Sequence, residues 1–214
     1  RQAGFAEADP RLDTEGHDAA NKLSILSAHA FGACVAPKEI LYTGITQIKK
    51  QDAQLAAEKN SEIKLIATAC KIDGDKLAAF ILPQFINKNE ELAQVKNEFN
   101  GIITESCFAD KHFFKGKGAG AYPTAAAVLS DISALRYQYK YEYRKLQQAK
   151  ELNYSNDYYL KVYVSAPEVD LIPQTEFESI EEWHNGYNQH WAIGIIHAKK
   201  LFENNWWKQD SVSL

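Results

Sequence analysis

The clearest pattern of apolar and polar positions lies near the start of the chain. Apolar residues there recur at spacings of four, three and four, as on one face of an α-helix: Ala19, Leu23, Leu26 and Ala30. A neighbouring row with the same spacing holds Asp18, Lys22, Ile25 and His29. Gly32 stands where such a helix would end. The pattern therefore predicts an amphipathic helix over residues 19–30 whose apolar stripe packs against another element.

Strand patterns dominate the middle of the chain. Residues 63–70 and 76–83 are rich in apolar residues, and Asp73-Gly74 between them is a strong hairpin signal. Three further elements are predicted around them: a strand over 39–48, a polar helix over 50–60 and more sheet over 92–107. Helices and strands mix without strict alternation. This order favours an α+β fold, with a mostly antiparallel or mixed sheet covered by helices on one face.

A glycine-rich segment precedes a second predicted helix. Residues 115–120 contain three glycines, Pro123 suits a first helical turn, and residues 125–135 have a helical pattern. Four tyrosines that follow alternate with polar residues, which is typical of a half-exposed strand: Tyr137, Tyr139, Tyr141 and Tyr143. Beyond a polar linker, two strands and a helix are predicted at 158–164, 190–196 and 199–204.

Composition narrows the class of protein. The chain is 45% hydrophobic and 24% charged, as in a folded globular protein, and its apolar runs are far shorter than the roughly 20 residues of a membrane span. With 24 basic and 28 acidic side chains, the net charge of −4 predicts no nucleic-acid partner. Three cysteines without a C-x-x-C pair favour a reduced, cytoplasmic protein. Cys34 and Cys70 are expected to be buried, and no histidine spacing predicts a metal site.

Asp18 and Lys22 are four residues apart, so their side chains should meet on the helix surface. As a stabilising pair they would contribute only about 0.3–0.5 kcal/mol. One interpretation is a solvated acidic helix start favoured by the helix dipole. In the other, an ammonium held by a carboxylate, with Glu7 returning from the preceding loop, surrounds a small polar substrate. Such a lysine could protonate a carbonyl oxygen as hydride reaches the carbon.

Two long motifs decide between these interpretations, because together they resemble the homoserine dehydrogenase family. The first resembles the substrate-site motif of that family: Glu7-x-Asp9-Pro10-x-x-Asp13-x-x-Gly16-x-Asp18-x-x-x-Lys22. The second resembles its glycine-rich segment: Gly116-x-Gly118-Ala119-Gly120-x-x-Pro123-Thr124-Ala125-x-Ala127-Val128. They occur in the family's order, and the resemblance covers residues 1 to about 135.

The resemblance implies a reaction, a site and a cofactor. The family interconverts L-homoserine and L-aspartate 4-semialdehyde with NADP or NAD. Lys22 matches its proton-transferring lysine, Glu7 and Asp18 match acids that hold the substrate, and Asp13 supports them. Gly4, Gly118 and Gly120 match glycines that lie close to the nicotinamide of the cofactor in this family. The family's N-terminal nucleotide-binding domain, which holds most of the cofactor and contributes a second lysine, does not precede these motifs here, so this piece alone is expected to be inactive.

The resemblance also suggests a domain plan. Residues 1–144 correspond to the catalytic and dimerisation domain, residues 145–156 to a linker, and residues 157–214 to a degenerate regulatory or structural domain of the ACT type. Tyr158–Val164 resembles the first ACT strand, but the usual Pro-Gly-Val-Leu after it is replaced by Ser165–Val169. A homodimer or higher homo-oligomer in the cytoplasm is expected.

Three alternatives stay open. The chain could be a non-catalytic dimerisation and amino-acid-binding module. Gly116-x-Gly118-x-x-Ala121 with Glu142 also fits a loose dinucleotide fingerprint, although the flanking stretches are too polar for buried parallel strands. A single-strand nucleic-acid platform, disfavoured by the acidic total, would use the alternating tyrosines and six basic residues: Lys111, Lys115, Lys117, Arg136, Lys140 and Arg144.

Overall fold

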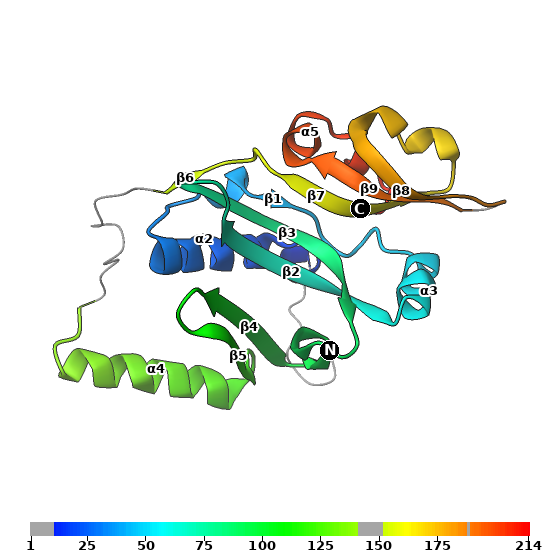
Figure 1. Cartoon of the computed structure of the whole chain (residues 1–214). Coiled ribbons are helices and arrows are strands. Elements are labelled where there is room, and N and C mark those ends of the chain that lie inside the picture. Colours follow the sequence, from blue (N-terminus) through cyan, green and yellow to red (C-terminus); the bar gives the residue numbers. More distant parts are fainter. Residues whose placement is uncertain (1–10, 141–151, 188) are drawn as a thin grey trace. The chain divides into compact units, whose positions relative to one another are not determined.

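The structure is a computed structural model that describes residues 11–140, 152–187 and 189–214, with only the backbone of Arg11 and Asp13. It confirms the predicted α+β class, with three sheets in the described residues (Figure 1). The chain divides into two compact units. The described parts of the first, which we call the hairpin unit, are residues 56–64 and 85–140. Those of the second, the helix–sheet unit, are residues 11–55, 65–84 and 152–214 without residue 188.

A sheet with the strand order β1-β3-β2 lies mostly in the helix–sheet unit: β1 (Leu41–Tyr42), β3 (Lys76–Asn87) and β2 (Ser61–Lys71). The short strand β6 (Asn153–Tyr154) also pairs with β3, and both β1 and β6 run parallel to it. The predicted Asp-Gly turn connects β2 to β3, with Gly74 at a φ of 59°. The strand expected over 39–48 is reduced to two residues, because a 3₁₀ turn (Pro37–Glu39) precedes it and tight packing at Gly44 follows it.

The first predicted helix is present as α2 (His17–Phe31), after the short helix α1 (Arg11–Thr14). It ends at Gly32, whose N–H bonds to Ala28 O and whose φ is 70°. The predicted stripe is only partly right, since Leu26 is 44% exposed and the buried helix positions are Ala20, Leu23, Ser27 and Ala28. Ala20 and Leu23 share a core with alternate residues of β3: Leu77, Ala79 and Ile81.

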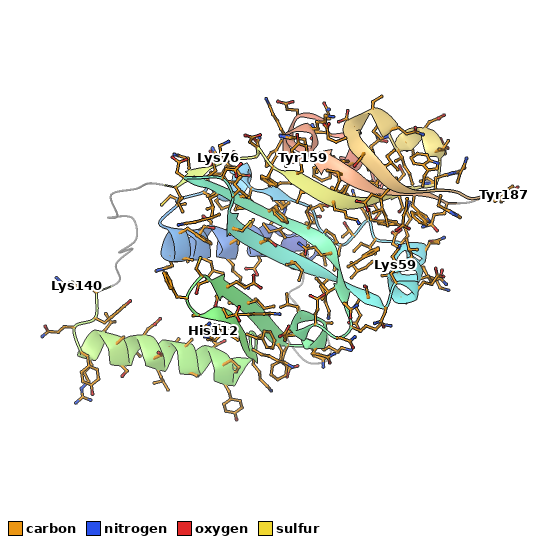
Figure 2. The ribbon with its side chains drawn as sticks, in the orientation of Figure 1. Lys59, Lys76, His112, Lys140, Tyr159 and Tyr187 are labelled. Atoms are coloured by element: carbon orange, nitrogen blue, oxygen red, sulfur yellow. The ribbon has the colours of Figure 1, made fainter. Side chains whose placement is uncertain are left out.

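The C-terminal residues form a separate sheet, which is antiparallel and has the order β7-β9-β8: β7 (Tyr159–Ala166), β9 (His190–His197) and β8 (Phe177–Asn185). Ser213 bridges Ser165 in the antiparallel sense on β7. The helix α5 (Ala198–Glu203) and several 3₁₀ turns complete this part: Val169–Leu171, Gln174–Glu176 and Trp206–Lys208. Tyr187 lies at the tip of the β8–β9 hairpin (Figure 2).

One hydrophobic cluster joins the two sheets of this unit. It contains Leu41 and Leu82 from the first sheet together with residues after position 159, among them Val164, Leu201 and Trp207. The proposed boundary at 145–156 lies partly outside the described residues. The described residues of this segment, 152–156, pack on the sheet: Leu152 is 8% exposed, and β6 pairs with β3.

The hairpin unit contains a 3₁₀ turn (Glu91–Gln94), the antiparallel hairpin β4 (Phe99–Ser106) and β5 (Asp110–Lys117), and the helix α4 (Ala121–Arg136). The helix α3 (Lys50–Glu58) runs from one unit into the other. The sheet expected over 92–107 is confined to β4, and β5 was not predicted. Its charged residues suit it because nearly all of its side chains are exposed.

Two sequence-based expectations are wrong. Residues 137–140 are not a strand, because Tyr137 caps α4 and Gln138 takes a φ of 56°; Tyr141 and Tyr143 lie outside the described residues. Cys34 and Cys70 are exposed rather than buried. Of the helices that the structure describes, none has both the length and the apolar character that a bilayer crossing requires.

Candidate functional site

The predicted contact between Asp18 and Lys22 is present. Lys22 Nζ lies 2.6 Å from Asp18 Oδ2, and the two side chains are 61% and 43% exposed. A pair this open to water contributes only a few tenths of a kcal/mol to stability. The pair matters for chemistry rather than for stability, because it holds an ammonium and a carboxylate side by side on the first two turns of α2.

The start of α2 has an unusual backbone. Gly16 precedes the helix at φ 84° and ψ 6°, a left-handed conformation that favours glycine, and no side chain of the described residues caps the helix there. A Cβ at Gly16 would lie 3.3 Å from Thr43 O, so the loop also packs closely on the segment after β1. Asp18 lies in the first turn, where the helix dipole favours a carboxylate.

His17, the first residue of α2, has two side-chain partners. Its Nδ1 lies 3.1 Å from the Tyr42 hydroxyl, and its Nε2 lies 3.3 Å from Glu15 Oε2. The imidazole and the Tyr42 ring meet edge to face, with centroids 5.3 Å apart at 65°. The sequence predicted none of these contacts, because Tyr42 is 25 positions away and no periodic pattern connects it to His17.

The predicted cofactor glycines lie in the hairpin unit. Gly118 N donates to Glu98 O at 2.8 Å, and a Cβ at Gly118 would meet Asn100 Nδ2 at 2.1 Å. The chain's own Asn100 therefore explains why position 118 has no side chain. Gly120 adopts φ 122° and ψ 158° directly before α4, a region open essentially only to glycine. The N–H groups of Ala121 and Tyr122, in the first turn of α4, have no acceptor within the helix.

The remaining predicted residues are only partly placed. Gly4 and Glu7 lie outside the described residues, and Asp13 lies in α1 with only its backbone described. Asp18 and Lys22 belong to the helix–sheet unit, whereas Gly118 and Gly120 belong to the hairpin unit. Within the described ranges, no group of three or more His, Cys, Asp and Glu side chains could hold a metal ion.

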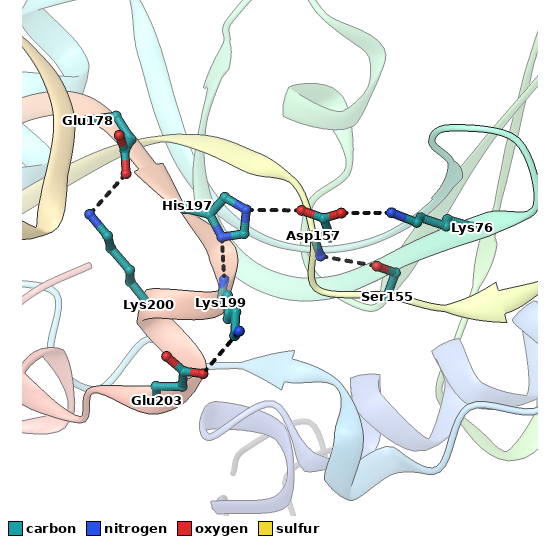
Figure 3. A network of polar contacts seen from close by, with 8 residues as sticks. All are labelled: Lys76, Ser155, Asp157, Glu178, His197, Lys199, Lys200 and Glu203. Carbon is teal, nitrogen blue, oxygen red and sulfur yellow. Dashed lines mark hydrogen bonds and ion pairs between the residues drawn. The ribbon is translucent and has the colours of Figure 1, made fainter.

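Two polar clusters were missed by the sequence analysis. In the first, Asp157 lies between Lys76 and His197 (Figure 3), with Lys76 Nζ 2.7 Å from Oδ2 and His197 Nε2 3.2 Å from Oδ1. The Lys76 hydrogen bond and, after it, the His197 bond lower the pKa of Asp157. His197 Nδ1 accepts from Lys199 N and so caps α5, which leaves neither ring nitrogen available for chemistry.

The second cluster surrounds Asp52, which is 1% exposed. Its carboxylate accepts hydrogen bonds from Lys49 N, Tyr163 Oη and Ser165 Oγ, each at 2.7 Å. Burial, followed by the bond to Asp52, raises the pKa of Tyr163 above its ordinary range. The carboxylate is fully bonded, so it joins α3 to β7 and does not await a ligand.

Known proteins resemble this chain in both sequence and structure. A family model described as homoserine dehydrogenase matches residues 1–133. The homoserine dehydrogenase of Corynebacterium glutamicum is 38% identical over 133 residues, which are 60% of this chain and 30% of that protein. The Bacillus subtilis homoserine dehydrogenase is 37% identical over 132 residues, 62% of this chain and 30% of that protein. The matched region is thus about 30% of the length of these relatives.

Solved structures share the fold. The structure of a homoserine dehydrogenase from Thiobacillus denitrificans aligns with all of this chain and 54% of its own, at a TM-score of 0.75 and 23% identity. That of the Staphylococcus aureus homoserine dehydrogenase at pH 7.5 aligns with 94% of this chain and 52% of its own, at a TM-score of 0.65 and 25% identity. Since the family model matches more than half of the 214 residues, the chain belongs to the homoserine dehydrogenase family.

Proposed function

We propose that this chain is the substrate-binding part of an NAD(P)-dependent oxidoreductase that interconverts L-homoserine and L-aspartate 4-semialdehyde. This reaction serves the biosynthesis of threonine, methionine and isoleucine. The observation that carries the proposal is the Asp18–Lys22 pair at 2.6 Å, on a helix inside the region that matches the family.

Lys22 is the proposed acid and base. In the reducing direction, the carbonyl oxygen of the semialdehyde gains an electron pair as hydride reaches the carbon, and the Lys22 ammonium gives it a proton. In the oxidising direction, neutral Lys22 takes the proton from the homoserine hydroxyl. Asp18 keeps the ammonium in place through their contact, and it binds the substrate together with Glu7. Asp13 supports these two acids.

NADP or NAD, when bound, supplies or accepts the hydride. Gly4, Gly118 and Gly120 are the proposed cofactor contacts of this chain. The conformation of Gly120 fits such a role, because it exposes the first N–H groups of α4 to a ligand without an intervening side chain. Gly118 fits less well, since Asn100 occupies the space beside it. Most of the cofactor site belongs to the part of the relatives that this chain does not span.

We further propose a cytoplasmic homodimer or higher homo-oligomer and an ACT-like C-terminal segment. The order β7-β9-β8, with Ser213 bridging Ser165, supports the ACT-like assignment, because it places strand partners on both sides of β7. We describe the segment as degenerate because the usual Pro-Gly-Val-Leu is replaced after β7, where the chain forms two 3₁₀ turns.

A non-catalytic dimerisation and amino-acid-binding module is the second candidate. The hairpin unit favours it, because α4 buries none of its side chains within the described structure. Its exposed apolar residues include Val128, Leu129, Ile132 and Leu135. An apolar surface of this kind indicates association with another protein surface.

Comparison of the 214-residue chain with a longer protein that includes the nucleotide-binding region tests the proposal. We expect homoserine-dependent formation of NAD(P)H from the longer protein and none from the 214 residues alone. Calorimetry should detect homoserine binding to the longer protein. Absence of turnover in the longer protein, with homoserine still bound, would favour the non-catalytic module.

A further inference from the structure

His17 stands directly before Asp18 but has no part in the proton transfer proposed above. Its imidazole contacts Tyr42 Oη through Nδ1 and Glu15 Oε2 through Nε2, at 3.1 and 3.3 Å. We call these three side chains the His17 clamp. The imidazole is 44% exposed, so one side of the clamp faces water.

The chemistry of the three groups fixes the direction of the bond to Glu15, whereas the direction of the bond to Tyr42 follows the protonation of Nδ1. An ionised Glu15 carboxylate can only accept, so Nε2 carries the hydrogen and donates it. In the neutral imidazole Nδ1 is then an acceptor, and the Tyr42 hydroxyl donates to it. The edge-to-face contact between the two rings restricts the imidazole further.

Tyr42 is itself fixed by the sheet. It pairs with Ile81 in the β1–β3 ladder, and the next residue, Thr43, donates from N to Ile81 O at 3.0 Å. Two positions later, Ile45 N donates to Thr14 O at 2.8 Å. A Cβ at Gly44 would lie 2.1 Å from the same Thr14 oxygen, so backbone meets backbone here. The clamp therefore ties the start of α2 to β1; both elements are labelled in Figure 1.

The first turn of α2 depends on this tie more than an ordinary helix start would. Gly16 provides no side-chain cap, and without a Cβ it restricts the backbone before the helix less than another residue would. Asp18 is the next residue after His17, and Lys22 is bound to Asp18. A rotation of the first turn would therefore move the carboxylate and the ammonium together.

We propose that His17 is a positioning residue for the substrate: the clamp fixes the rotation of the first turn of α2 and thereby the direction in which Asp18 presents its carboxylate to homoserine. This inference rests on the substrate-binding role proposed for Asp18. It adds a requirement that the imidazole stay between the Tyr42 hydroxyl and the Glu15 carboxylate, its two partners in the structure.

Steady-state kinetics of the longer, active protein test this role. We expect His17→Ala and Tyr42→Phe each to raise the KM for homoserine about tenfold, the size of effect that one lost hydrogen bond can produce. The KM for NAD(P)⁺ should change less than twofold. His17→Asn, whose Oδ1 can take the place of Nδ1 as the acceptor for Tyr42, should restore most of the affinity. Tyr187→Phe is the matched control, because Tyr187 is 99% exposed.

Nitrogen NMR of the imidazole gives a readout that does not depend on activity. In the 214-residue chain we expect the Nδ1 resonance of His17 to move in Tyr42→Phe, because this substitution removes the hydroxyl that Nδ1 contacts. A loss of melting temperature with both KM values unchanged would show a purely structural clamp and overturn the inference. An active protein whose homoserine KM ignores both substitutions would also overturn it. Absence of turnover in the unsubstituted longer protein would instead refute the proposed function, and this role with it.

Discussion

The Ser165 hydroxyl on β7 donates a 2.7 Å hydrogen bond to the Asp52 carboxylate on α3, across 113 positions of the sequence. Both side chains are buried, at 1% exposure each. The bond connects the part of the chain that matches the family to the C-terminal segment beyond it. It therefore makes α3 a point at which the stability of the C-terminal sheet can be tested.

Asp52→Ala should destabilise the chain by about 3 kcal/mol, because it removes the acceptor of the buried Ser165 hydroxyl and of the half-buried Tyr163 hydroxyl. Urea unfolding followed by circular dichroism measures the change. Glu58→Ala, at an exposed position of the same helix, is the control and should change stability by less than about 0.5 kcal/mol. Equal effects of the two substitutions would contradict the importance assigned to the buried cluster.

Lys22→Ala in the longer, active protein should lower kcat by two or more orders of magnitude, since the proton would lose its positioned carrier. The melting temperature should change little, because the ion pair with Asp18 is open to water. Lys38→Ala, which removes another exposed lysine, should leave kcat unchanged. A Lys22→Ala variant with normal turnover would remove Lys22 from the proposed chemistry.

Gly120→Ala should cost about 1–3 kcal/mol, because alanine is strained at φ 122° and ψ 158°. Gly116→Ala is a close control in the same segment: a Cβ there would meet no atom within 4 Å, and its φ lies outside the positive region. Thermal unfolding of the two variants tests the difference. A Gly116→Ala variant as unstable as Gly120→Ala would show that the strain at position 120 is not the cause.

The pair of Asp157 and Lys76 should make stability depend on acid. Folding lowers the pKa of Asp157, first through Lys76 and then through His197, so the unfolded chain binds a proton more readily. The stabilisation is present above the ordinary aspartate pKa and is lost as pH falls through the lowered folded value. Asp157→Asn should therefore reduce unfolding free energy at neutral pH, and the difference from the unsubstituted chain should shrink towards pH 3. Strong salt should reduce the same difference, since both groups are exposed. A difference that is constant with pH would contradict this account.

Local rules predicted the parts of the fold that local contacts determine. The four-residue spacing of Asp18 and Lys22 predicted their contact, Gly32 predicted the end of α2, and Asp73-Gly74 predicted the turn between β2 and β3. The buried face of α2 was displaced from the predicted stripe, because tertiary packing on β3 selects Ala20 and Leu23 but leaves Leu26 open.

Long-range contacts account for what was missed. The charged composition of β5 and the acidic side chains of β8 hid both strands, whose exposed faces tolerate polar residues. The partners of His17 and Asp52 come from other elements, Tyr42 on β1 and Ser165 on β7, and no spacing in the sequence relates them. Such contacts follow from topology, which a single sequence does not reveal.

The antiparallel bridge between Ser213 and Ser165 has a practical consequence for anyone who prepares this protein. Val212, directly before the bridge, is 0% exposed and belongs to the same core as Val164. An affinity tag joined directly to Leu214 would strain the bridge at Ser213 and the buried position of Val212, whereas a flexible spacer before the tag would leave both in place. Removal of Val212, Ser213 and Leu214 to improve crystals would expose the residues of β7 that they contact to water.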